Sequence, residues 1–213
     1  IILVERDRAG LKFIKPNKLG SHASDMTEIS FENVKVPVEN LLGDQGKEFD
    51  LIEHSIFESL SIATISLGTS QFALEKILKY LKTREVFGDP LEKFQVLRHR
   101  IAKMASEIEL NRQFLINLYK RFEKGDYLFK EALMAKLLAT QLCDRVTLDC
   151  FQMFGGHGPI EEYPINRIWR DSKSKQIGGG TSEILCEIIS KAIIDRKAFD
   201  SVKSEKKKQT SKI

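Results

Sequence analysis

Several kinds of site are missing from this chain of 213 residues. It has no Cys-x-x-Cys pair and no His-Glu-x-x-His motif, and its four histidines stand far apart, so we expect no metal site. Three cysteines are too few, and odd in number, for a disulfide scaffold, and they favour a reducing, cytosol-like compartment. No apolar run approaches the length of a membrane span, so none is expected.

A basic face for nucleic acid is also missing. The last eleven residues, 203–213, hold five Lys and one Glu and so account for the whole net charge of +4. The body is formally neutral, which argues against a nucleic-acid footprint spread over a folded face. We interpret residues 201–213 as a basic, disordered tail.

Residues 1 to about 37 have the pattern of β structure, and we expect their domain to end at residue 46. The chain opens without Met at Ile1–Glu5, which resembles a strand, and we expect a fragment that starts inside a β domain. Residues 27–31 alternate polar and apolar side chains and predict a second strand. Targeting information would then lie outside this sequence. The compartment expected is the cytoplasm, or the mitochondrial matrix in a eukaryote.

From residue 47 to 200 the apolar period becomes that of helices. Turn residues divide this part into helices predicted at about 47–87, 94–122, 127–154 and 181–199, with a loop at 155–180. Each apolar stripe must be buried against another. The expected fold class is therefore mainly α, a four-helix bundle preceded by the end of a small β domain.

Glu58 is the only formally charged side chain between His54 and Glu75. A helix there would carry one carboxylate into largely apolar surroundings. Burial disfavours the ionised form of a carboxylate, which suits a general base. The alternative is an uncharged helix face with one Glu at its edge, and the residues alone leave both open.

Two glycine-rich loops flank the predicted loop at 155–180. Residues 152–158 and 177–184 contain glycines that let the backbone approach a ligand closely. Glycines leading into Thr181 at a helix start would offer free N–H groups to an anion or a carbonyl oxygen. The alternatives are a helix C-cap for Gly155 and an N-cap for Thr181. Arg84 could hold a pyrophosphate or complement a helix C-terminus.

Together these motifs resemble the C-terminal half of an acyl-CoA dehydrogenase, over about residues 1–197. The marks are Phe31 to Pro37 with Asn40 to Gly43, Arg84 to Gly88 with Phe94-Gln95, Gln152 to Gly158, Tyr163-Pro164, Arg170-Asp171, and Gly179 to Ile184. The resemblance implies the fold of that family without its N-terminal part: the end of the middle β domain and the C-terminal bundle. It also implies FAD-dependent α,β-dehydrogenation of an acyl-CoA thioester to the trans-2-enoyl-CoA.

The resemblance also assigns a base. In many members a Glu before the Gly-Thr of the last motif takes the α-proton, and here that position is Gly179. A smaller branch, with isovaleryl-CoA and long-chain acyl-CoA dehydrogenases, carries the base on the first bundle helix. Counting back from Arg84 puts that position at Glu58, the predicted catalytic residue.

Further roles carry over by matched position. The N–H of Gly179 would bind the thioester carbonyl, and Gly180 would line the acyl pocket beside Phe57 and Ser59. Glycine at 178 and 179 would leave room for a branched or wide acyl group. The residues expected to bind FAD are Thr181 and Glu183 and, for the FAD of a neighbouring subunit, Arg84, Gln95, Gln152, Gly155 and Gly156. The last five imply a homodimer or homotetramer, and the activity implies an electron-transfer flavoprotein as acceptor.

Two positions depart from the family pattern, and two other readings stay open. Ser59 stands where relatives often have Arg, and Val86 where many have a hydroxyl. A flavoprotein oxidase of the same fold would reduce oxygen directly, and a nitroalkane oxidase would carry Asp as its base. A non-catalytic helical interaction module is the reading from another class. We expect that this chain alone does not hold FAD.

Overall fold

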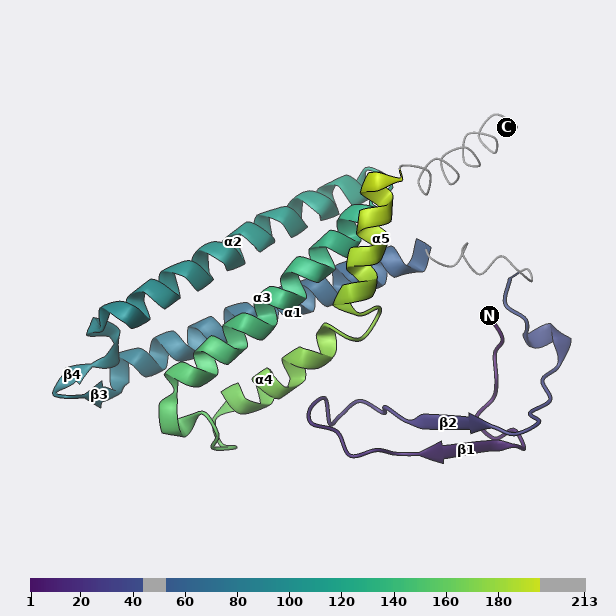
Figure 1. Cartoon of the computed structure of the whole chain (residues 1–213), viewed down its shortest axis with the longest axis horizontal. Helices are drawn as coiled ribbons and strands as arrows, with labels where there is room; N and C mark the ends of the chain where they lie inside the picture. The colour runs from purple at the N-terminus through teal and green to yellow at the C-terminus, as the bar shows by residue number, and fades with distance from the viewer. Residues whose placement is uncertain (44–52, 196–213) are drawn as a thin grey trace.

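The computed structural model describes residues 1–43 and 53–195 (Figure 1). The predicted boundary between residues 46 and 47 and the predicted tail at 201–213 lie outside the described residues. Residues 53–195 are mainly helical and follow a small β segment in residues 1–43, as the sequence predicts. None of its helices is both long enough and apolar enough to cross a membrane.

The β segment contains one two-stranded antiparallel sheet. Strand β1 (Leu11–Ile14) pairs with β2 (Glu28–Phe31), with Leu11 opposite Phe31 and Ile14 opposite Glu28. The strand predicted at residues 27–31 is confirmed as β2. The strand predicted at the start is wrong, because only an isolated bridge joins Ile2 to Leu41 there. A 3-10 turn, η1 (Val38–Asn40), follows Pro37.

Three long helices run beside one another and form the body of the bundle (Figure 1). They are α1 (Glu53–Thr83), α2 (Gln95–Glu123) and α3 (Phe129–Met153). A short hairpin, β3 (Glu85–Val86) and β4 (Asp89–Pro90), and the 3-10 turn η3 (Leu91–Lys93) join α1 to α2. The first helix was predicted to reach Phe87. It ends at Thr83 because Phe87 and Gly88 take positive φ angles of 55° and 84° in the hairpin turn.

Two shorter helices complete the bundle. After the 3-10 turn η4 (Gly155–His157), α4 (Pro164–Lys175) returns along α1 and α3, and α5 (Ser182–Ile194) packs on α3. The loop predicted at residues 155–180 is therefore wrong over α4. The signals were present: Pro164 stands in the first helical turn, where proline is favoured, and Ile165, Ile168 and Ser172 recur on one buried face.

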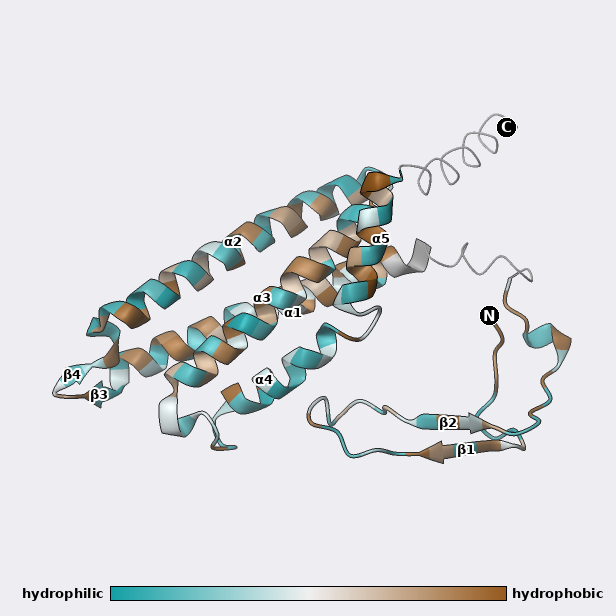
Figure 2. Cartoon of the chain, in the orientation of Figure 1, coloured by the Kyte–Doolittle hydropathy of each residue, from teal (hydrophilic) through white to brown (hydrophobic). Residues whose placement is uncertain are grey.

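The core lies between the long helices, and α3 is central to it. Apolar and polar residues alternate in stripes along α1, α2 and α3 (Figure 2). One buried cluster, with Ile77, Met104 and Val146, lies toward the β3–β4 end, and a second, with Leu60 and Leu118, lies toward the start of α1. Helix α3 contacts α1, α2, α4 and α5, so even a polar side chain on its inner faces is buried.

The β segment touches the bundle through the loop between β1 and β2. The N–H of Ser21 donates to Asp171 Oδ1 at 2.5 Å, and the hydroxyls of Ser21 and Ser174 lie 3.1 Å apart. A Cβ on Gly20 would lie 2.6 Å from the carbonyl oxygen of Arg170. Only glycine therefore fits this approach of the loop to α4.

Candidate active site

Glu58 and Gly179, 121 positions apart in the sequence, lie against each other in the structure. A Cβ on Gly179 would be 2.9 Å from Glu58 Oε1 and 3.0 Å from Ile62 Cδ1. The carboxylate on α1 therefore occupies the space into which a side chain at position 179 would point. The loop between α4 and α5 brings the glycine to the first part of α1.

The expectation that Glu58 is buried is wrong for this chain. Glu58 is exposed, and Phe57 beside it is 65% exposed, whereas Ser59 is only 3% exposed. The segment around Glu58 has no other charged side chain, but only the face of α1 with Ile56, Ser59 and Leu60 packs inward. Phe57 and Glu58 are thus open to a ligand, and Ser59, predicted to contact substrate, turns into the core.

The glycine loop has a backbone that few other residues would adopt. Gly179 and Gly180 have φ angles of +63° and +99°, in the region that favours glycine. Thr181 then caps α5: its Oγ1 accepts from the N–H of Ile184 at 3.4 Å, so the N-cap interpretation is confirmed. A hydrogen bond to its own backbone N–H and a second with Thr181 lower the pKa of the Glu183 carboxyl.

A buried lysine that is not among the predicted site residues holds this loop. Lys136 of α3 is 0% exposed, and its Nζ donates to the carbonyl oxygens of Gly178, Gly179 and Gly180 at 2.6, 2.6 and 2.7 Å. The signal was its position four residues after Ala132 and four before Thr140, on a face of the helix that is buried.

The residues predicted to bind FAD fall into two groups at opposite ends of α1. Thr181 and Glu183 lie in the glycine loop and the first turn of α5, near Glu58. Arg84 directly follows the last residue of α1, roughly 38 Å along the helix from Glu58 at 1.5 Å per residue. One dinucleotide does not span that length, so the two groups do not form one site within this chain.

The second group surrounds the far end of the bundle, at the end of α1 and of α3 and the start of α2. Gln95 is the first residue of α2, and Gln152 lies in the last turn of α3. Gly155 and Gly156 begin η4. All four residues are exposed. Arg84 is exposed too and forms no ion pair or side-chain hydrogen bond with the residues that the structure describes.

An aromatic cluster ties the Gly155–Gly158 turn to α1. The hydroxyl of Tyr80 lies 2.7 Å from His157 Nδ1 and donates to the carbonyl of Phe154 at 3.2 Å. The His157 ring stacks on Tyr163 with centroids 4.9 Å apart. Burial raises the pKa of Tyr80, with the Arg84 charge acting the other way, so its hydroxyl keeps its proton for these contacts.

The Gly155–Gly158 turn also leaves space for a large ligand. Side chains at Gly155 and Gly156 would meet no atom within 4 Å, and Gly155 has a φ angle of +58°. Bare backbone beside a free arginine suits a phosphate-bearing cofactor, because N–H groups and a guanidinium both bind phosphate oxygens. The residues present therefore fit FAD at this end.

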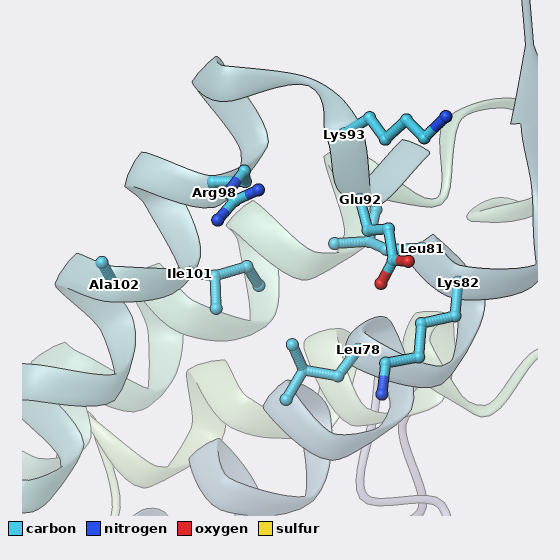
Figure 3. Close-up of a pocket in the computed structure, with 8 residues that line it drawn as sticks. All are labelled: Leu78, Leu81, Lys82, Glu92, Lys93, Arg98, Ile101 and Ala102. Carbon is cyan, nitrogen blue, oxygen red and sulfur yellow. The ribbon is translucent and has the colours of Figure 1, made fainter. Parts of the chain in front are cut away.

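One pocket, of about 460 Å³, also lies at this end of the bundle (Figure 3). It opens between the end of α1, η3 and the start of α2. Its lining residues are Leu78, Leu81, Lys82, Glu92, Lys93, Arg98, Ile101 and Ala102. None of the predicted site residues lines it. Among the described residues, no group of His, Cys, Asp and Glu is arranged to hold a metal ion.

The fold and the site together define a helical-bundle domain with an accessible carboxylate against a glycine loop. Comparison with known proteins gives the family of this domain. The family model for the acyl-CoA dehydrogenase C-terminal domain matches residues 56–194. The chain therefore belongs to the acyl-CoA dehydrogenase family.

Relatives and solved structures give the extent of the match. The probable acyl-CoA dehydrogenase YngJ of Bacillus subtilis is 36% identical over 195 residues, 91% of this chain and 51% of the relative. The mitochondrial short/branched chain specific acyl-CoA dehydrogenase of Bos taurus is 38% identical over 193 residues, 90% of this chain and 45% of the relative. The crystal structure of acyl-CoA dehydrogenase from Geobacillus kaustophilus has a TM-score of 0.86 at 35% identity, covering 91% of this chain and 51% of that one. The chain thus spans about half the length of the relatives it matches.

Proposed function

We propose that the full-length protein dehydrogenates an acyl-CoA thioester between Cα and Cβ, with Glu58 as the base. The observation that carries the proposal is the contact of the Glu58 carboxylate with Gly179. The resemblance puts the base of many family members at position 179. A carboxylate carried by α1 into the same space would serve the same substrate atom, so Glu58 replaces the side chain that Gly179 lacks.

The residues of this chain have distinct tasks in that reaction. Glu58 takes the α-proton, and its exposure leaves it accessible to a thioester laid against Phe57 and the glycine loop. The N–H of Gly179 donates to the thioester carbonyl oxygen, where negative charge develops as the proton leaves. When bound, FAD supplies the acceptor for the hydrogen that leaves Cβ as hydride.

The proposed cofactor contacts use both ends of the bundle. Thr181 and Glu183 touch the FAD that serves Glu58, and Arg84, Gln95, Gln152, Gly155 and Gly156 hold the FAD of a neighbouring subunit. The distance along α1 supports this division, since the second group lies far from Glu58. The proposal includes a homodimer or homotetramer and an electron-transfer flavoprotein as the electron acceptor.

The acyl pocket is proposed to accept a branched or wide group. Neither Gly178 nor Gly179 has a side chain, and a Cβ on Gly178 would meet only the carbonyl oxygen of Ser174, at 3.5 Å. Turnover confined to short straight-chain substrates would contradict this part of the proposal.

The test compares the full-length wild type with Glu58→Gln. Each is mixed anaerobically with straight and branched acyl-CoAs, and loss of oxidised-flavin absorbance is followed. We expect bleaching in the wild type and a rate lower by about 10²–10⁴-fold in Glu58→Gln, because the amide removes the general base without changing the side-chain shape.

Glu75→Gln is the matched control. Glu75 is exposed on the same helix and accepts a hydrogen bond from Gln71, far from the glycine loop. The flavin of the Glu75→Gln variant should bleach at the wild-type rate. Equal bleaching in wild type and Glu58→Gln would mean that the base lies elsewhere. Bound flavin that no acyl-CoA bleaches would favour a same-fold enzyme with other chemistry.

A further inference from the structure

Lys136 is the most unusual buried side chain among the described residues. It is fully buried in α3, and its one ammonium group donates to three consecutive backbone carbonyls, those of Gly178, Gly179 and Gly180. These carbonyls follow the C-terminal end of α4, where the helix dipole favours a positive charge.

Burying this charge is costly, so the contacts must compensate. Burial lowers the pKa of Lys136, and the charge of Glu58 acts in the opposite direction. Three short charge-assisted hydrogen bonds satisfy all three ammonium protons. An apolar side chain would pack in this core without any desolvation cost. The charge therefore has a task at the loop.

The peptide geometry shows which task. In a trans peptide the C=O and the following N–H point in opposite directions, and no described peptide bond is cis. With three carbonyls directed at Lys136, the N–H groups of Gly179, Gly180 and Thr181 face away from it. None of these three donates a hydrogen bond to any residue that the structure describes.

We propose that Lys136 is a positioning residue: by binding the carbonyls of residues 178–180, it aims the Gly179 N–H at the thioester carbonyl and keeps Gly179 against Glu58. This inference rests on the proposed function. Lys136 itself touches neither substrate nor reacting atoms. It acts through the loop, whose glycines alone would not hold one conformation.

The experiment measures whether the protein recognises the thioester carbonyl. Full-length wild type and Lys136→Met are titrated with two ligands of equal chain length that are not dehydrogenated: the 2-enoyl-CoA and an S-alkyl-CoA thioether, which lacks the carbonyl oxygen. The perturbation of the flavin spectrum gives each Kd. We expect the wild type to bind the enoyl-CoA more tightly than the thioether. In Lys136→Met the ratio of the two Kd values should be smaller by about 3- to 10-fold, which is the effect of one misdirected hydrogen bond.

The rate of flavin reduction by a saturating acyl-CoA is the second readout. It should fall by about 10- to 100-fold in Lys136→Met, because a displacement near 1 Å has effects of this size. The matched control is Thr147→Val. Thr147 is equally buried in α3; its hydroxyl donates to the carbonyl of Cys143 and lies 3.2 Å from the Ser172 hydroxyl of α4, away from the loop. It should melt at a lower temperature with unchanged ligand preference and rate.

An unchanged ligand preference in Lys136→Met, or an equal loss in Thr147→Val, would overturn the proposal. If Lys136→Met does not fold, Lys136→Arg takes its place; it keeps the charge but moves the donors, and a smaller loss of preference is expected. If Lys136→Arg then preferred the enoyl-CoA over the thioether as strongly as the wild type, the positioning role of Lys136 would be refuted. Because the ligands do not react, this readout is independent of whether Glu58 is the base.

Discussion

Gly179→Ala tests the contact on which the proposed site depends. The new Cβ would lie 2.9 Å from Glu58 Oε1, 3.0 Å from Ile62 Cδ1 and 3.2 Å from Glu58 Cδ. A Cβ essentially never lies under 3.0 Å from another heavy atom, so the end of the Glu58 side chain must move aside. The backbone adds a second cost, since alanine would have to take the φ angle of +63°.

Two magnitudes follow from this geometry. A left-handed conformation costs a residue with a Cβ roughly 1–2 kcal/mol, which lowers the melting temperature by about 2–8 °C. Moving a reacting group by about 1 Å reduces the rate of the chemical step by roughly 10²-fold. We expect Gly179→Ala to fold, to melt slightly lower, and to reduce its flavin about a hundred times more slowly than the wild type.

The control for Gly179→Ala is its neighbour. Gly178 lies outside the positive-φ region, and its Cβ would meet only the Ser174 carbonyl oxygen, at an ordinary 3.5 Å. Gly178→Ala should keep the wild-type melting temperature. Its flavin-reduction rate should also be that of the wild type when the substrate is a short straight-chain acyl-CoA, which does not need the room that Gly178 leaves. The assay is anaerobic rapid mixing with a saturating acyl-CoA, together with thermal melting. If Gly179→Ala reduces its flavin at the wild-type rate, the contact with Glu58 has no catalytic meaning.

Two further outcomes are expected. In Gly20→Ala the new Cβ would lie 2.6 Å from the backbone carbonyl oxygen of Arg170. Denaturant unfolding should therefore show a loss of stability of about 1–3 kcal/mol. Unchanged stability would contradict the docking of this loop on α4. Burial raises the pKa of Cys143, and that of Cys150 to about 12, and both thiols are shielded from solvent. Of the three cysteines, only the exposed Cys186 should be labelled by a thiol reagent in the native protein, as mass spectrometry would show. Fast labelling of all three would refute the packing of α3.

The helices that the sequence predicts well are those with a long apolar stripe. The stripe of α2 ends close to where the structure ends the helix, because its buried residues are spaced by four, seven and three positions and so keep to one helix face. Helix α4 was missed because it is short and mostly polar. Ile1–Glu5 resembled a strand by composition alone, but a strand needs regular pairing. The structure has only the isolated bridge of Ile2 with Leu41 and the two backbone hydrogen bonds beside it.

The sequence by itself determined the family, the mainly helical fold and the candidates Glu58 and Gly179, because residue types and spacing are local properties. Only the tertiary structure decided that Glu58 and Gly179 meet, that Glu58 is exposed while Ser59 is buried, and that Lys136 holds the loop. Which side of a helix is buried depends on what packs against it. A side chain such as Lys136 finds its partners some forty residues away only after α3, α4 and α5 have come together.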